Sequence, residues 1–332
     1  MAAPVRLVVN PSAGGGRAGK LAPAVLEALR GHGLEVSRAD TRDLGHAREL
    51  GAAAASAGET VVALSGDGLI GVLADTLRAI PGAVLGVLPG GRGNDLARVL
   101  GIPADAVEAC AVIAGGVVRP LDLGVVTAGE QMSEQAFVGI ASAGFDSDAN
   151  RIANEAPAWL GGGVYAYGAL RALLSWRPAH FSIELDPPSP ADPHGAPGER
   201  HSFTGYSVAL ANSRAYGGGM QLAPEAMLDD GLLDIVLSER ASKLTFLRSL
   251  PKVFAGTHVE LDSVRVFRAA EVTVSSDRPF TMYADGDPIG ELPLRVRAQR
   301  AAVQVLVPDL AGSAFSPPGG RSAVGGSSAP GG

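Results

Sequence analysis

Two segments of this chain combine an apolar strand, a tight glycine turn that carries an acid, and a helix. They cover residues 61–69 and 84–98, and their acids are Asp67 and Asp95. Because the loops after parallel strands meet at one edge of a sheet, both turns would line one crevice with backbone N–H groups and two carboxylates. Such a crevice suits a nucleoside triphosphate and its magnesium ion.

Strands and helices alternate through the first part of the chain. The sequence predicts a short buried strand at 6–9 and further strands at 34–39, 61–64 and 84–88. Helical spacing of apolar residues predicts helices at 20–30, 46–57, 69–79 and 94–100. The alternation predicts an α/β nucleotide-binding domain over residues 1–122, built on a parallel sheet covered on both faces.

After Asp122 the pattern changes to short alternating segments separated by Gly, Pro and Asp turns. This pattern is typical of a mainly antiparallel β-sandwich, which we assign to residues 123–310 as a second, substrate-binding domain. We expect that its last strand, 294–306, can return to the sheet of the first domain.

Four further segments interrupt or follow the predicted sandwich. Helices are expected at 163–176 and 243–254, and a proline-rich loop at 187–198. Residues 312–332 are Gly, Ser, Pro and Ala almost throughout, so we expect 311–332 to be a disordered tail that buries too little apolar surface to order.

Composition narrows the class of protein. The net charge of −7 argues against a nucleic-acid partner held by bulk charge. The single cysteine, Cys110, excludes an internal disulfide and has apolar neighbours, which predicts a buried thiol. No signal-like segment and no apolar run of roughly 20 residues occurs, so we expect a cytoplasmic protein that meets a membrane only peripherally, at its inner face. A homodimer is compatible with the sequence but not indicated by it.

A third glycine turn, residues 10–19, follows the first strand. Gly14, Gly16 and Gly19 fit the G-x-G-x-x-G dinucleotide pattern, with an acid farther on at Glu35 or Asp40. The segment is interpreted either as a phosphate-binding turn, with Arg17 and Lys20 as charge partners, or as a plain flexible turn.

The acids and the amide in the two main turns also have structural interpretations. Asp67 would bind a magnesium-bound water or order an Asp-Gly turn. Asn94 is a suitable helix N-cap, and Asp95 in the first helical turn is favoured by the helix dipole. Arg92 would contact a phosphate.

Several ordered motifs together resemble the lipid kinase catalytic domain shared by diacylglycerol kinases, YegS-like lipid kinases, sphingosine kinases and ceramide kinase. The resemblance covers about residues 4–308. The motifs are Asn10-Pro11, Ser65-Gly66-Asp67-Gly68, residues 89–95, 212–220, 223–226, Asp230-Gly231-Leu232-Leu233-Asp234, and Asp285-Gly286-Asp287 in place of the family's DGE.

The resemblance implies a set of site residues. ATP would bind at Asn10, Thr41, Ser65, Gly66, Asp67, Gly68, Leu69, Gly91, Arg92, Asn94 and Asp95. Asp287 would accept the proton of the acceptor hydroxyl, helped by Asp285, and Asp67 would serve catalysis through magnesium. A structural Mg²⁺ would bind the carboxylate of Asp230 and the carbonyls of Met227 and Leu232, with Asp122 supporting the site.

The chain departs from the family pattern at four places. Leu69 replaces a threonine, Gly71-Val72 replaces Asn-Glu, Arg92 replaces a threonine, and Asp287 replaces a glutamate. The shorter Asp287 retains a carboxylate but places it about one methylene farther back, and catalytic geometry is sensitive on that scale.

The sequence therefore indicates an ATP- and Mg²⁺-dependent lipid kinase that converts diacylglycerol to phosphatidic acid. A sphingoid base or another hydroxyl lipid is an alternative substrate. Three different functions also stay open: a catalytically silent nucleotide-binding protein, a kinase of a soluble substrate on the same fold, and a dinucleotide-dependent oxidoreductase.

Overall fold

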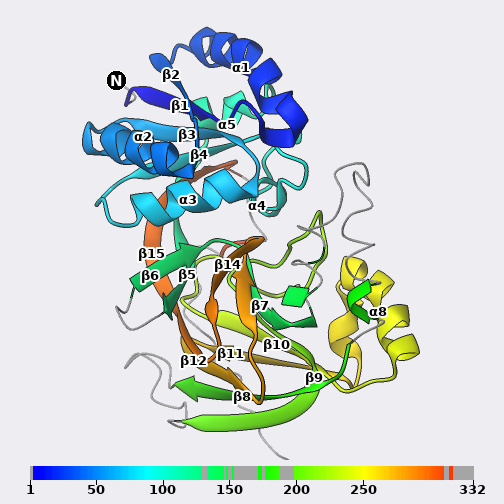
Figure 1. Cartoon of the computed structure of the whole chain (residues 1–332). Helices are drawn as coiled ribbons and strands as arrows, with labels where there is room; N and C mark the ends of the chain where they lie inside the picture. The colour runs from blue at the N-terminus through cyan, green and yellow to red at the C-terminus, as the bar shows by residue number, and fades with distance from the viewer. Residues whose placement is uncertain are drawn as a thin grey trace, which may run out of the picture.

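The computed structural model describes residues 3–128, 133–145, 147–148, 152, 171–173, 176–186, 198–309 and 314–316. Figure 1 shows two parts, an N-terminal α/β part above and a β-rich C-terminal part below, joined by the strands β5 and β15. The expected α/β domain with a parallel sheet and the mainly antiparallel C-terminal domain are confirmed.

The N-terminal sheet is parallel, in the order β4-β3-β1-β2. Its strands are β1 (Val5–Val9), β2 (Val36–Asp40), β3 (Thr60–Ser65) and β4 (Val84–Pro89). The helices are α1 (Ala13–Gly31), α2 (Leu44–Ser56), α3 (Asp67–Leu77), α4 (Asp95–Val99) and α5 (Cys110–Gly115). The pair α2 and α3 and the pair α1 and α5 lie on opposite faces of the sheet (Figure 1). β3 and β4 are buried almost throughout, which explains their continuous apolar sequences.

The strands of the C-terminal part pair antiparallel. They are β6 (Ser133–Phe137), β7 (Ile140–Gly144), β8 (Ala179–Asp186), β9 (Glu199–Ala211), β10 (Leu233–Glu239), β11 (Val264–Ala269), β12 (Glu271–Ser276), β13 (Thr281–Ala284) and β14 (Asp287–Glu291). Helix α8 (Lys243–Ala255) and the short 3-10 helix η2 (Thr257–Glu260) lie at one side of the sheet (Figure 1).

Two long strands connect the parts. β5 (Val117–Ala128) pairs antiparallel with β15 (Leu294–Val307) along most of its length. β15 also pairs with β12 in the C-terminal part and, parallel, with β4 at Gln304 and Val305. The chain therefore has no break at residue 122, which lies inside β5, and its last long strand completes the N-terminal sheet.

Each part has its own apolar core. One cluster lies between the N-terminal sheet and its helices and includes Leu7, Leu64, Leu73 and the buried thiol of Cys110. The other fills the C-terminal sandwich around Phe181 and neighbouring side chains. No helix in the described part of the chain has the length and hydropathy needed to cross a membrane.

Some local predictions need correction. α5 and the β13–β14 hairpin were not predicted from the sequence. Ala314 and Phe315 are buried in the N-terminal core, and the backbone carbonyl of Ala314 accepts a hydrogen bond from Leu228, so this part of the predicted tail is packed. The rest of 311–332, most of the predicted 163–176 helix and nearly all of the 187–198 loop lie outside the described residues.

Candidate active site between the two parts

Three glycine turns meet at the carboxyl edge of the N-terminal sheet. A Cβ on Gly91 would lie 2.4 Å from the Cα of Gly66, so the turns after β3 and β4 touch backbone to backbone. A Cβ on Gly14, whose φ is +62°, would lie 2.5 Å from the carbonyl oxygen of Gly90. The convergence requires glycine, because any side chain at these positions would push the turns apart.

Asp67 begins α3 and reaches across to the next helix. Its Oδ1 accepts a hydrogen bond of 3.1 Å from the backbone N–H of Leu96 in the first turn of α4. Burial raises the pKa of Asp67, and the nearby charge of Asp95 adds to the rise, while backbone N–H groups oppose it. A Cβ on Gly93 would lie 3.1 Å from Oδ2 of Asp67 and 3.3 Å from Oδ2 of Asp95, so both carboxylates lie around this glycine.

The predicted capping role of Asn94 is wrong. Asn94 occupies the N-cap position of α4 in a left-handed conformation, and its side chain makes no capping hydrogen bond. Instead its Oδ1 accepts from the N–H of Gly91 at 2.8 Å, and its Nδ2 donates to the carbonyl of the same residue at 3.1 Å. Asp67 supplies the acceptor for α4, which leaves Asn94 to close the glycine turn.

Asp95 joins the two parts of the molecule. It is buried, pairs with Arg98, and accepts at Oδ2 a hydrogen bond of 2.8 Å from the N–H of Gly218. Arg98 also donates to the carbonyl of Gly93 at 3.0 Å. Both oxygens of Asp95 therefore have protein partners, and Asp95 holds the 212–220 segment against the N-terminal glycine turns.

On the opposite side, Asp285 fixes the turn between β13 and β14. Its carboxylate accepts three backbone hydrogen bonds, from Val138 at 2.8 Å, Gly139 at 2.9 Å and Ile140 at 3.2 Å. Burial raises the pKa of Asp285 to about 6, against the effect of these donors, and the charge of Asp67 contributes to the rise. Asp285 and Asp67 thus interact across the gap between the two parts.

Asp287 lies two residues farther on and is exposed. A pocket between the two parts contains it. The walls come from α3 (Gly68, Gly71, Val72, Asp75), from α2 (Arg48), from β6 (Gln135, Ala136, Phe137) and from the hairpin (Ala284, Asp285, Asp287, Ile289). The exposed carboxylate of Asp287 therefore lies in the same pocket as that of Asp285, which the backbone holds.

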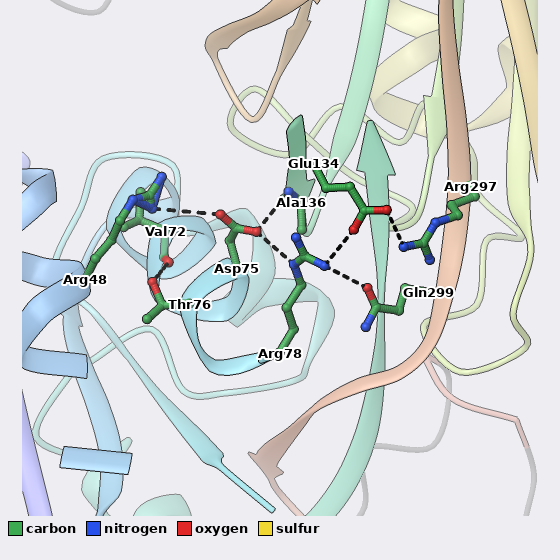
Figure 2. Close-up of polar contacts among 9 residues, drawn as sticks. All are labelled: Arg48, Val72, Asp75, Thr76, Arg78, Glu134, Ala136, Arg297 and Gln299. Atoms are coloured by element: carbon green, nitrogen blue, oxygen red, sulfur yellow. Dashed lines mark hydrogen bonds and ion pairs between the residues drawn. The ribbon is translucent and has the colours of Figure 1, made fainter. Parts of the chain in front are cut away.

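A network of charged and polar groups, which includes Asp75 of the pocket wall, connects α3 with β6 and β15 (Figure 2). Asp75 accepts from Arg78 at 2.9 Å and from the N–H of Ala136 at 3.0 Å. Arg78 donates to Glu134 at 3.2 Å and to Gln299 at 3.1 Å. We did not predict this network from the sequence; the available signal was an Asp–Arg pair three residues apart on an otherwise apolar helix.

The predicted metal site lies away from this pocket's walls, beside β10. Asp230 accepts from the N–H of Leu232 at 2.9 Å, and Asp122 holds the preceding turn by accepting from Gly231 at 2.6 Å. Burial, followed by the charges of Asp234 and Asp122, raises the pKa of Asp230 to about 6. A divalent cation would relieve this repulsion, and oxygen donors suit Mg²⁺. Among the described residues, no group of three or more His, Cys, Asp or Glu side chains is placed to hold a metal ion, so such a site would depend on the carbonyls of Met227 and Leu232.

The remaining predicted nucleotide residues lie along the same sheet edge. Asn10 accepts from the backbone and the hydroxyl of Ser12, and Thr41 donates its N–H to the carbonyl of Val9 at 2.8 Å. Ser65 is buried at the end of β3, whereas Arg92 is exposed in its turn. Leu69 is buried in α3, so its side chain belongs to the core.

Asn212 is a further residue that connects the parts, and the sequence singled it out only as the start of a motif. It is completely buried, and its Nδ2 donates to the carbonyls of Asp122 and Val138 at 2.9 and 2.8 Å. It therefore joins β5 to the segment whose N–H groups bind Asp285.

Two domain families and several sequence relatives match this chain. The diacylglycerol kinase catalytic domain matches residues 4–126, and the YegS C-terminal NAD kinase beta sandwich-like domain matches residues 139–307. A diacylglycerol kinase of Mycobacterium tuberculosis is 36% identical over 309 residues, covering 92% of this chain and 95% of that protein. A diacylglycerol kinase of Bacillus subtilis is 30% identical over 296 residues, covering 87% and 91%.

A solved structure of a diacylglycerol kinase from Bacillus anthracis superposes with a TM-score of 0.70, at 19% identity, covering 92% of this chain and 96% of that one. At this identity the superposition supports the fold alone. The two domain matches and the sequence relatives assign the chain to a family of enzymes: it belongs to the diacylglycerol kinase-like lipid kinases.

Proposed function

We propose that this protein transfers the γ-phosphoryl group of ATP to the free hydroxyl of diacylglycerol, forming phosphatidic acid. The observation that carries the proposal is that Asp285 and Asp287 line one pocket together with Gly68 and Gly71 of α3. Asp67, the residue before Gly68, lies near enough for its charge to act on Asp285, although the two are far apart in the chain. The relatives named diacylglycerol kinase support the choice of acceptor.

The glycine turns provide the phosphate site. Gly66 and Gly91 bring the start of α3 and the turn after β4 together, and the backbone N–H groups of these turns would bind the phosphates. The N–H of Gly91 already donates to Asn94, so its part is to close the turn. The exposed Arg92 adds a cation at the mouth of the turn. Alignment and charge stabilisation of this kind supply most of the rate in phosphoryl transfer.

The hairpin provides the proton acceptor. Asp287 is exposed in the pocket and takes the proton of the lipid hydroxyl, while Asp285 holds the turn through its three backbone partners. Asp285 is a positioning residue in this scheme. Its backbone contacts keep Asp287 facing the N-terminal turns.

Two sites fit magnesium. Asp67 would hold one ion near the phosphates, and Asp230 with the carbonyls of Met227 and Leu232 would hold a structural one. When bound, Mg²⁺ neutralises phosphate charge and lowers the repulsion among the carboxylates. Asp67 also stabilises α4, so its replacement affects more than metal binding.

The test is a phosphoryl-transfer assay with purified protein, Mg²⁺ and ATP labelled at the γ-phosphate. The acceptor is diacylglycerol or sphingosine in detergent micelles, or glycerol in solution. We expect labelled phosphatidic acid from diacylglycerol and none without Mg²⁺. If only sphingosine gave a product, the protein would still be a lipid kinase, but its substrate would be a sphingoid base. Phosphorylation of glycerol alone would indicate a kinase of soluble acceptors, and ATP binding without any product would indicate a silent nucleotide-binding protein.

A further inference from the structure

Helix α8 presents an apolar face to solvent. None of its residues is fully buried. Phe246 and Val253, on one side, pack against the C-terminal cores. On the other side Leu244, Leu247 and Phe254 are 55%, 43% and 56% exposed. Exposure of this size on three large apolar side chains of one helix calls for a partner.

The exposed apolar residues form a continuous stripe. Leu244, Leu247, Pro251 and Phe254 follow each other at intervals of three or four residues, which places them along one helical face. The stripe faces away from Phe246 and Val253. The helix therefore has an inner apolar face for the sandwich and an outer apolar face for something else.

Cations border the outer face, and acids are absent from this stretch. Residues 240–259 include Arg240, Lys243, Arg248 and Lys252 but no Asp or Glu, in a chain whose net charge is −7. Arg248 and Lys252 are exposed beside the apolar stripe. An apolar face bordered by cations fits the interface of a bilayer that contains anionic lipids.

We propose that α8 is the membrane-docking element of this protein. Its stripe, Leu244 to Phe254, enters the headgroup and acyl boundary of an anionic bilayer while Arg248 and Lys252 contact lipid phosphates. The inference rests on the proposed function in that it gives a lipid kinase its route to a bilayer-embedded substrate.

The backbone links α8 to the active site. The carbonyl of Val253 accepts a hydrogen bond of 2.9 Å from Gln221, which directly follows the 212–220 segment. In that segment Gly218 donates to Asp95 at the N-terminal glycine turns. Figure 1 shows α8 beside the C-terminal sheet. A bilayer seated on α8 is therefore connected to the interdomain site through a short stretch of hydrogen-bonded backbone.

The test is flotation of the full chain with vesicles of phosphatidylcholine, with and without phosphatidylglycerol, in the absence of ATP. The variant pair Leu247→Glu/Phe254→Glu introduces charge into the stripe. The control pair Leu44→Glu/Val107→Glu makes the same kind of change at apolar residues that are 46% and 37% exposed in the N-terminal part. Thermal unfolding of each variant checks the fold.

We expect the parent and control proteins to float with vesicles that contain phosphatidylglycerol. The α8 variant should partition at least about tenfold more weakly, because each glutamate removes apolar area and adds like charge to the anionic surface. Reversal of the flanking charges in Arg248→Glu/Lys252→Glu should weaken binding only when phosphatidylglycerol is present and salt is low.

Three results would overturn the proposal. The first is a parent protein that stays with the aqueous phase, and the second is equal loss of binding in the control pair. The third is a parent dimer, seen by light scattering, that the α8 variant converts to monomer without any change in vesicle binding, since a second copy would then cover the stripe. A protein that phosphorylates micellar diacylglycerol yet ignores vesicles refutes the docking inference alone; vesicle binding without lipid phosphorylation refutes the proposed activity alone.

Discussion

The two sides of the interdomain pocket are constructed differently. On the N-terminal side, Gly66 and Gly91 bring backbone against backbone, and in the proposed function the same turns would also supply the N–H groups for phosphate. On the C-terminal side, one carboxylate, Asp285, holds the hairpin, and a separate one, Asp287, faces the pocket. On the N-terminal side, the same backbone would both hold the turns together and bind the phosphate. On the C-terminal side, Asp285 holds the hairpin and Asp287 would accept the proton.

The largest effect should come from Asp287→Asn. The amide keeps the size of the side chain but cannot accept a proton, so kcat should fall about a hundredfold or more, within the usual range for loss of a general base. Because Asp287 is exposed, the melting temperature should not move. Asp287→Glu should retain activity, and Asp262→Asn, at another exposed aspartate, should behave as the parent. Full activity of Asp287→Asn would show that another group accepts the proton.

The next effect should come from Gly91→Ala, on the other side. The new Cβ would lie 2.4 Å from the Cα of Gly66, so a backbone segment must move, and unfolding free energy should fall by about 2 kcal/mol. Denaturant unfolding measures this loss, and the KM for ATP should rise with it. Gly68→Ala is the matched control for stability, since no atom lies within 4 Å of the position that its new Cβ would take. Equal stability of the two variants would show that the turns do not touch.

The raised pKa of Asp285 predicts how the stability of the fold changes with pH. Burial raises its folded pKa from 3.8 to about 6, so between these values the folded protein keeps a proton that the unfolded chain releases. Stability should therefore fall as the pH rises from about 4 to about 6. Asp285→Asn should make this slope shallower, and so should Asp230→Asn, whose pKa is raised similarly. Urea unfolding across this range measures the slope; an unchanged slope in both variants would contradict the shifts.

The smallest effect, of opposite sign, is expected where the two sides meet. Gly71 lies inside α3, and its Cβ would be 3.4 Å from Oδ2 of Asp285, an ordinary contact. Gly71→Ala should therefore raise the unfolding free energy by about 0.5–1 kcal/mol through the better helix propensity of alanine. Calorimetric unfolding tests this gain. A clear loss of stability would mean that the gap between α3 and Asp285 is narrower than the structure has it.

The sequence by itself determined the parallel and antiparallel regions and the glycine turns after β1, β3 and β4. These features are local: an apolar run, a glycine and a helical spacing lie within a few residues of one another, and each limits the backbone directly. The order of the motifs also identified the enzyme family, which the domain matches confirm.

Only the tertiary structure decided how the acids are used, because their partners are distant in the chain. Asp67 caps a helix 29 residues away, Asp95 binds Gly218 at a separation of 123, and Asp285 binds Val138 at a separation of 147. The local sequence predicted that the side chain of Asn94 caps α4, whereas in the structure the carboxylate of Asp67 accepts the hydrogen bond from the first turn of α4. A sequence pattern identifies a carboxylate that can bind a backbone N–H, but packing of remote segments selects which N–H it meets.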